Sequence, residues 1–290
     1  MNVLSLFDGM SCGQLALKSA GVRYNVYYAS EIDKSAIKIT QKNFPRTKQL
    51  GDITNWRSWD LPRIDLIIGG SPCQGFSKAG KGLNFEDPRS KLFFVFVDII
   101  KTLLPRWFLL ENVKMKAEWV EVINSYMGVT PILLNSALVS AQNRERLYWT
   151  NIPTVFTVPK DKGILISDIK ESNVDAKYNL TDKARAKIER YSKNYVVTGK
   201  SPTLTTELAH STGSTITPKL IKEIGEDRRA TPIECERLQT IPDNYTDGVS
   251  DSRRYFMLGN GWTVDIIVHL FKDLVLKSKD LFEDSQTTLF

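Results

Sequence analysis

The chain has 290 residues and a mass of 32.9 kDa, which is enough for one large domain or for a large and a small one. With 42% apolar and 25% charged residues, its composition is that of a globular protein and excludes disordered, collagen-like and disulfide-scaffold chains. The net charge of +6 permits a polyanionic partner such as a nucleic acid but does not require one.

Apolar runs and helical stretches alternate over residues 1–110. The expected strands cover residues 3–7, 25–30, 64–68 and 107–110, and the expected helices cover residues 14–20, 34–42 and 91–104. This alternation predicts an α/β fold with a parallel, doubly wound sheet, whose ligands bind at the carboxyl ends of the strands. Five chemically active side chains stand at or after these strand ends: Asp8, Glu31, Asp52, Cys73 and Glu111.

The pattern changes after about residue 151, where the sequence becomes rich in Lys, Ser and Thr. One amphipathic helix is expected over residues 181–194, with an apolar stripe of Leu180, Ala184, Ile188 and Tyr191. Regular helices are expected again from residue 231 and over residues 264–277. We therefore expect a catalytic domain of residues 1–150 and 253–290 and a smaller, irregular domain of residues 151–252.

Basic residues concentrate in one segment, residues 177–200. Seven Lys and Arg residues stand there against Asp182 and Glu189, which leaves a charge of +5. Such a segment is either a solvated helix face or a nucleic-acid surface, and its composition alone does not decide between them.

We expect neither a membrane segment nor a metal site. The most apolar stretch, residues 92–110, is interrupted by charged residues and by Pro105, and the N-terminus lacks the basic region of a signal peptide. Cys12, Cys73 and Cys235 form no Cys-x-x-Cys pair, which argues against a disulfide framework and a zinc site. These features favour a reducing, cytoplasmic location.

The first strand–helix turn, residues 7–13, lacks the three glycines of a dinucleotide-binding loop. Asp8 would repel a pyrophosphate but not a cationic ligand. Glu31 ends the second expected strand, where related folds place an acid that accepts from ribose hydroxyls. The pair suits S-adenosylmethionine, whose sulfonium is positive. The alternative is an ordinary strand–helix turn in which Asp8 is the N-cap.

A candidate nucleophile, acid and anion-binding pair follow one another along the chain. Cys73 lies in the Gly- and Pro-containing loop of residues 69–77, an unusual place for a packing cysteine. Glu111 opens the sequence Glu-Asn-Val after the fourth strand. Arg144 and Arg146, in Gln-Asn-Arg-Glu-Arg, are two residues apart and would share one face of an extended segment.

These segments resemble the DNA cytosine-5 methyltransferase family, which carries Pro-Cys-Gln, Glu-Asn-Val and Gln-x-Arg-x-Arg elements in this order. The resemblance continues in further segments along nearly the whole chain: residues 51–52, 87–93, 231–239 and 258–264. Pro-Cys-Gln-Gly-Phe-Ser is typical of bacterial and phage members, whereas Ser-Leu-Phe-Asp-Gly and the Trp262 element resemble the animal de novo branch. Ser90 departs from the glycine of many relatives.

The resemblance implies a Rossmann-like, S-adenosylmethionine-dependent methyltransferase sheet with a smaller target-recognition domain. It implies methylation of cytosine C5 in double-stranded DNA, in the setting of DNA methylation and restriction–modification. Cys73 would attack C6 of a flipped-out cytosine and form a covalent intermediate. Glu111 would hydrogen-bond the ring at N3, and Arg144 and Arg146 would hold the nucleotide.

The resemblance also assigns binding residues. Those expected at the cofactor are Phe7, Asp8, Gly9, Gly13, Glu31, Ile32, Asp52, Ile53, Pro72, Asn260 and Trp262. Those expected at DNA are Gln74, Ser77, Lys78, Gln142, Arg185, Lys200 and Thr203. Asp52 has an alternative role as the N-cap of the residues that follow it.

Three other functions are open: a tRNA cytosine-5 methyltransferase of the same family, a non-catalytic DNA-binding accessory protein, and a small-molecule methyltransferase. The first would carry a Cys-Phe-Thr element, which this chain lacks. The second would not need Cys73 together with Glu111 and Arg144, and the third would not need the basic segment. A monomer is the default state, and residues 286–290 loosely resemble a sliding-clamp peptide.

Overall fold

The computed structural model describes residues 1–71, 88–153, 158–209 and 216–284. The chain divides into two compact units. Unit 1 comprises Met1–Leu134, Glu145–Val158 and Ile267–Phe290, and unit 2 comprises Asn135–Arg144 and Pro159–Ile266. Each unit is therefore built from segments that are separated in the sequence.

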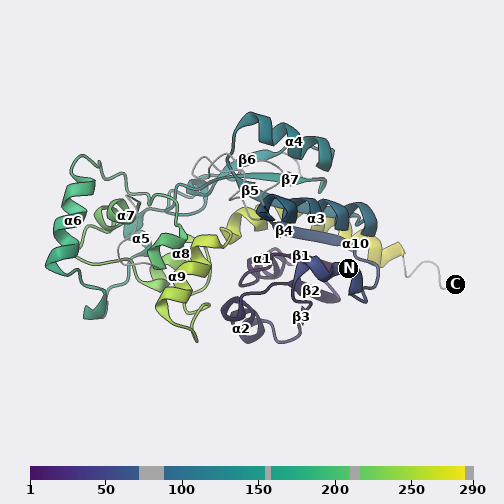
Figure 1. The fold of residues 1–290 in the computed structure, drawn as a ribbon, viewed down its shortest axis with the longest axis horizontal. Helices are drawn as coiled ribbons and strands as arrows, with labels where there is room; N and C mark the ends of the chain where they lie inside the picture. The colour runs from purple at the N-terminus through teal and green to yellow at the C-terminus, as the bar shows by residue number, and fades with distance from the viewer. Residues whose placement is uncertain (72–87, 154–157, 210–215, 285–290) are drawn as a thin grey trace. The chain divides into compact units, whose positions relative to one another are not determined.

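A seven-stranded sheet organises unit 1 (Figure 1). Its strands are β1 (Asn2–Leu6), β2 (Val26–Ser30), β3 (Lys48–Gln49), β4 (Leu66–Gly70), β5 (Trp107–Val113), β6 (Ile132–Asn135) and β7 (Glu145–Thr150). The spatial order is β3-β2-β1-β4-β5-β7-β6, and β1, β2, β3, β4 and β5 pair in parallel. The predicted α/β fold with its doubly wound order is confirmed.

The sheet is mixed rather than wholly parallel, because β7 pairs with β5 in the antiparallel direction. β5 also runs three residues beyond its predicted end, so Glu111 lies within the strand and not after it. The cause is the antiparallel pairing, in which Glu111 lies opposite Tyr148 and Val113 opposite Arg146. This pairing extends the ladder past the last purely apolar residue.

Helices connect the strands of the sheet and recur along unit 2. Those that connect the strands are α1 (Cys12–Ser19), α2 (Lys34–Asn43), η1 (Ile53–Ser58), α3 (Pro88–Leu103), α4 (Ala117–Met127) and η2 (Ser136–Leu138). Those that follow β7 are α5 (Ile166–Ile169), η3 (Ala176–Tyr178), α6 (Asp182–Ser192), η4 (Thr206–Ala209), α7 (Ile216–Ile224), α8 (Pro232–Leu238), α9 (Asp251–Asn260) and α10 (Val264–Asp284).

Both faces of the sheet are buried, as its continuous apolar strands require. On one face, Leu4, Ile67 and Leu110 pack with Phe93 and Phe96 of α3. On the other, Val3, Leu66, Ile68 and Leu109 are likewise inaccessible to solvent. In the part of the chain that the structure describes, no helix has the length and apolarity needed to span a bilayer.

In unit 2, side-chain hydrogen bonds support the helices and the loops between them. Thr231 caps α8, and Glu234 returns the capping-box bond, as the Thr-Pro-Ile-Glu sequence predicts. The predicted helix of residues 181–194 is α6, capped by Thr181. Its stripe is only partly right, because Ile188 is buried whereas Tyr191 is 49% exposed.

Candidate active site

The turn after β1 is held by a buried carboxylate. Asp8 is 9% exposed and accepts hydrogen bonds from Ser11 Oγ at 2.5 Å and from the Tyr27 hydroxyl at 2.8 Å. Burial raises the pKa of Asp8 to about 6, and the hydroxyls of Ser11 and Tyr27 only partly offset this shift. Asp8 is not the N-cap of α1, because that position belongs to Ser11. The alternative role that the sequence left open for Asp8 is therefore wrong.

The backbone of this turn adopts a left-handed conformation at three residues. Phe7, Gly9 and Ser11 all have φ between 58° and 64°, the left-handed region. A Cβ built on Gly9 would meet no atom within 4 Å, so there is open space beside the turn. Gly13 lies in the first turn of α1 and is buried. The turn thus has space for a ligand at Gly9 and a buried acid behind it.

Glu31 ties the ends of β1 and β2 together. Its Oε2 accepts from the Gly9 amide at 2.7 Å, and its Oε1 accepts from the amides of Ile32 at 2.7 Å and Asp33 at 2.8 Å. Each carboxylate oxygen has two lone pairs, so Oε2 keeps one direction for a further donor. Ile32 beside it is 71% exposed, an apolar side chain at the carboxyl end of the sheet.

Asp52 begins η1 as its N-cap, the alternative role that the sequence left open. Its Oδ1 accepts from the amide and the hydroxyl of Thr54, both at 2.8 Å. Gly51 before it has φ 76° and, like Gly9, open space where a Cβ would be. Ile53 is buried under η1. Capping uses one carboxylate oxygen, so this role does not by itself decide the cofactor assignment.

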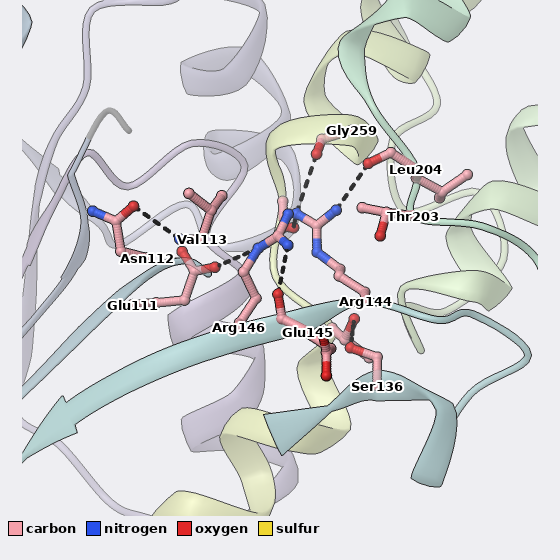
Figure 2. Close-up of polar contacts among 12 residues, drawn as sticks. Glu111, Asn112, Val113, Ser136, Arg144, Glu145, Arg146, Thr203, Leu204 and Gly259 are labelled. Atoms are coloured by element: carbon pink, nitrogen blue, oxygen red, sulfur yellow. Dashed lines mark hydrogen bonds and ion pairs between the residues drawn. The ribbon is translucent and has the colours of Figure 1, made fainter. Parts of the chain in front are cut away.

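Glu111 and Arg146 form an ion pair at the neighbouring strand ends (Figure 2). Arg146 Nε lies 3.0 Å from Glu111 Oε1, and both side chains are largely buried. The register of β5 and β7 explains the contact, because Arg146 lies opposite Val113 and so diagonally from Glu111 on the same face. An acid and a guanidinium in this arrangement can hydrogen-bond a planar, polar ring.

Asn112 connects the acid to the start of the expected nucleophile loop. It is buried, and its Nδ2 donates to Ser71 Oγ at 3.1 Å and to the Ser71 carbonyl at 3.4 Å. Its Oδ1 accepts from the Val113 amide at 2.8 Å, which fixes the orientation of the side chain (Figure 2). The expected loop residues themselves lie outside the described residues: Pro72, Cys73, Gln74, Ser77 and Lys78.

Arg144, expected to share a face with Arg146, has partners of its own within unit 2. Its Nη1 donates to the Leu204 carbonyl at 2.9 Å and its Nη2 donates to the Gly259 carbonyl at 3.2 Å (Figure 2). Its Nη2 also donates to the Gly261 carbonyl at 2.9 Å. The side chain is buried. β7 begins only at Glu145, so the extended segment that would align the two arginines does not include Arg144.

The other expected binding residues of unit 2 differ in exposure. Gln142 is fully buried, whereas Asn260 is exposed and Trp262 and Thr203 are half-buried. Lys200 Nζ donates to the carbonyls of Ala137 at 2.8 Å and Ser140 at 3.0 Å.

Ion pairs offset part of the charge of the basic segment. Arg185 pairs with Asp182 at 3.1 Å and with Asp227 at 3.0 Å. Lys177 pairs with Asp251 at 3.1 Å. Lys183, Arg190 and Lys193 remain exposed to solvent. The segment is therefore less positive than its count of bases suggests.

Sequence reasoning missed two parts of this arrangement. Tyr27, which holds Asp8, falls in the sequence analysis only within the second expected strand, although a buried Tyr hydroxyl usually needs a hydrogen-bond partner and Asp8 follows the neighbouring strand. The sequence indicates no role for Asn112 beyond its place in the Glu-Asn-Val motif. Its bond to Ser71 follows from the parallel register of β4 and β5, because Gly70 lies opposite Glu111 and the next residues adjoin.

Comparisons with known proteins agree with this geometry. The sequence profile of the C-5 cytosine-specific DNA methylases matches residues 1–276. The Type II methyltransferase M1.ScrFI of Lactococcus lactis subsp. cremoris is 33% identical over 96% of this chain and 79% of its own length. M.NlaX of Neisseria lactamica, also a Type II methyltransferase, is 31% identical over 91% and 93%.

Solved structures support the same fold. The methyltransferase EhMeth of Entamoeba histolytica superposes with a TM-score of 0.72 at 20% identity, covering 94% of this chain and 98% of its own. A sequence match over nearly the whole chain, on this sheet, establishes the family. The chain belongs to the C-5 cytosine-specific DNA methylases, enzymes that transfer a methyl group from S-adenosylmethionine to cytosine C5 in DNA.

Proposed function

We propose that this chain methylates cytosine through a covalent Cys73 adduct, on a base turned out of duplex DNA. The observation that carries the proposal is the Glu111–Arg146 pair, 3.0 Å apart, beside the Asn112 link to Ser71. This pair supplies an acid and a hydrogen-bond donor next to the carboxyl end of β4, from which the chain continues to Cys73. The C5–C6 bond of a stacked base is inaccessible to a thiolate, which is why the base must leave the helix.

The chemistry requires activation of C5, which is a weak nucleophile in cytosine. Glu111 carries a proton when the cytosine is bound; the Cys73 thiolate then forms a bond to C6 while N3 takes this proton, so that C5 becomes an enamine carbon. S-adenosylmethionine, when bound, supplies a methyl group on a positively charged sulfur. C5 takes this methyl group, which would leave S-adenosylhomocysteine as the product, and a base then removes the C5 proton. The S–C6 bond breaks, the C5–C6 double bond re-forms and N3 returns its proton.

Arg146 would orient both Glu111 and the cytosine in this reaction. Its Nε is engaged by Glu111 and its Nη1 by the Glu145 carbonyl at 2.8 Å. A guanidinium has five N–H donors, so others remain for the carbonyl oxygen of the pyrimidine. The pair would thus contact two neighbouring positions of one ring.

The residues at the carboxyl ends of β1 and β2 fit the methyl donor. Glu31 Oε2 has an unused lone pair for a ribose hydroxyl, and Ile32 offers an exposed apolar surface to the adenine. Open space lies beside both Gly9 and Gly51, where a ligand could approach the backbone. Asp8 places negative charge behind the turn, which favours a sulfonium. Phe7, Gly13, Asp52 and Ile53 complete this part of the site; Pro72, Asn260 and Trp262 are assigned to it by the family resemblance.

DNA recognition is assigned to residues 151–252, with phosphate contacts from exposed bases such as Lys183, Arg190 and Lys193. Gln74, Ser77, Lys78 and Thr203 are assigned to DNA by resemblance. The enzyme would act as a monomer in the cytoplasm, with the nucleoid. A sliding clamp that binds residues 286–290 is the further partner that their sequence suggests.

Trapping on 5-fluorocytosine DNA tests the covalent step. A base can remove the C5 hydrogen as a proton but cannot remove fluorine from C5, so a Cys73 adduct formed with S-adenosylmethionine would persist in denaturing gels. We expect an adduct with wild type and with Cys235→Ala, a buried cysteine of α8, and none with Cys73→Ala. An adduct of undiminished yield with Cys73→Ala would contradict the assignment.

A further inference from the structure

Gln142 and Arg144 hold both polar groups of one peptide. The Leu204 amide donates to Gln142 Oε1 at 2.8 Å, and the Leu204 carbonyl accepts from Arg144 Nη1 at 2.9 Å. Leu204 is 1% exposed, so these bonds replace water at a buried position. Two residues of one motif thus fix a single residue that lies about sixty positions along the chain.

The segment on either side of Leu204 is fixed as well. Ser201 forms a parallel bridge with Gln142, and the Asn143 amide donates to the Ser201 carbonyl at 2.8 Å. Thr203 Oγ1 donates to the Asn143 carbonyl at 2.7 Å. Residues 201–204 therefore run beside residues 141–144, held by one bridge and by hydrogen bonds at Ser201, Thr203 and Leu204.

A third element closes on the segment from α9. A Cβ built on Gly259 would lie 2.4 Å from the Thr205 carbonyl carbon and 2.5 Å from the Thr206 amide nitrogen. Only glycine permits this approach. Arg144 Nη2 reaches the Gly259 and Gly261 carbonyls, so the same guanidinium joins α9 to Leu204.

We infer that Gln142 and Arg144 are positioning residues that hold Ser201–Thr205 in one conformation for contact with DNA. The inference rests on the proposed function of residues 151–252. Thr203 in this segment is half-buried, so part of its surface is exposed to solvent next to the buried Leu204. Arg144 thereby acts on which DNA site is methylated, whereas Arg146 acts on the base that reacts. The two arginines of the motif have separate tasks.

Two variants test the inference, with Arg146→Lys as the comparison. Gln142→Met removes the acceptor of the Leu204 amide, and Arg144→Lys keeps the charge but cannot reach three carbonyls at once. Hydrogen exchange of residues 201–206 should quicken in both, with melting temperatures recorded to identify unfolded protein. If Arg144→Lys fails to fold, Gln142→Met alone tests the inference.

Methylation is measured on the DNA duplex that wild type methylates most efficiently and on duplexes that differ from it by one base pair. We expect discrimination between them to fall about tenfold, equivalent to about 1.4 kcal/mol, and the KM for DNA to rise. Adduct formation on saturating fluorinated duplex should remain near the wild-type level. Arg146→Lys should instead lose the adduct and keep its discrimination.

The inference is overturned if Arg144→Lys loses the adduct at saturating DNA with discrimination unchanged, as expected of a residue that touches the reacting base. It is also overturned if folded variants exchange and discriminate as wild type does. Failure of the proposed function would differ from both, because wild type itself would then form no adduct.

Discussion

Asp8 is a carboxyl group whose surroundings change its acidity. Both oxygens accept hydroxyl bonds, yet desolvation dominates and raises the pKa from 3.8 to about 6. The nearby Glu31 carboxylate adds to this shift. A raised carboxyl pKa means that the folded state holds the proton more tightly than the unfolded state does. The charge of Asp8 therefore costs stability at neutral pH.

Replacement of Asp8 should expose this cost. Below about pH 4 the group is protonated in both states and contributes nothing; the cost grows as pH rises to about 6, to roughly 3 kcal/mol for a shift of about two pKa units. The unfolding free energy of Asp8→Asn minus that of wild type should rise across this range. Urea unfolding between pH 4 and 7 measures it, with Asp60→Asn as an exposed control. A difference independent of pH would contradict the assignment.

Glu111 is the residue whose replacement should affect catalysis most after Cys73. Glu111→Gln removes the carboxyl proton donor while keeping a side chain of the same size. We expect kcat to fall about 10²- to 10⁴-fold, since general acids contribute this much. The dissociation constant for S-adenosylmethionine should stay within about threefold of wild type, because the remaining binding groups are intact. The neighbouring, exposed Glu145→Gln is the control, and equal losses in both would count against the role.

The positions of residues were predictable where one strand fixes the side chain. The sequence placed Glu111 just after a strand, within three residues of the observed end of β5, and the β5–β7 register then determines its contact with Arg146. Arg144 could not be placed in this way, because its carbonyl partners lie about 60 and 115 residues away in sequence. Long-range partners of a buried guanidinium leave no local pattern.

At the scale of elements, β4 and β5 are joined beyond their last paired residues by the Asn112 side chain. The amide donates to the carbonyl and the hydroxyl oxygen of Ser71, just before the chain continues toward Cys73. The contact keeps the start of the loop in register with the strand that carries Glu111.

Asn112→Ala should loosen this connection. A buried partner left without its bond costs about 1–3 kcal/mol, so the unfolding free energy should fall by that amount. Adduct formation on fluorinated duplex should also slow, since Ser71 is no longer fixed. The exposed Asn25→Ala is the matched control. Normal adduct kinetics in Asn112→Ala would exclude a role in loop placement.

In unit 2, the start of α8 depends on a buried ion pair. Glu234, with no exposed surface, accepts from Arg228 Nη2 at 2.7 Å and Nη1 at 2.8 Å, and from the amides of Thr231 and Glu171. All of these bonds converge on one carboxylate, so the pair ties the α8 N-terminus to two other segments.

Glu234→Gln should therefore be costly. Breaking a buried pair typically costs about 3–5 kcal/mol, because the other charge remains uncompensated. The exposed pair of Lys222 and Glu189, 2.7 Å apart, should matter far less, by about 1 kcal/mol at most, so Glu189→Gln is the control. Urea unfolding compares them. Similar losses of unfolding free energy in the two variants would contradict the claim that burial makes the Glu234 pair more important.

Elements with continuous apolar sequence were predictable, and those defined by distant pairing were not. The strands β1, β2, β4 and the start of β5 match their apolar runs. β7 was not predicted, and nothing in Glu145–Thr150 states that it pairs antiparallel with β5. Helix α9 was not assigned bounds from the sequence, and the close approach of its Gly259 to Thr205 is a long-range contact that leaves no local pattern.

At the scale of the whole chain, each unit is assembled from separated segments. Asn135–Arg144 belongs to unit 2 although residues on both sides of it belong to unit 1. The ten-residue insertion carries Gln142 and Arg144, so the motif that ends in Arg146 crosses from one unit to the other. A composition change near residue 151 could suggest two parts but could not reveal this crossing.

The central claim is that the enzyme methylates cytosine in DNA by means of Cys73. Wild type and Cys73→Ala would be incubated with methyl-labelled S-adenosylmethionine and duplex DNA, tRNA or neither, and the labelled base identified by mass spectrometry. We expect 5-methylcytosine in DNA with wild type alone. Label in tRNA only, or 5-methylcytosine at the wild-type rate with Cys73→Ala, would contradict the account.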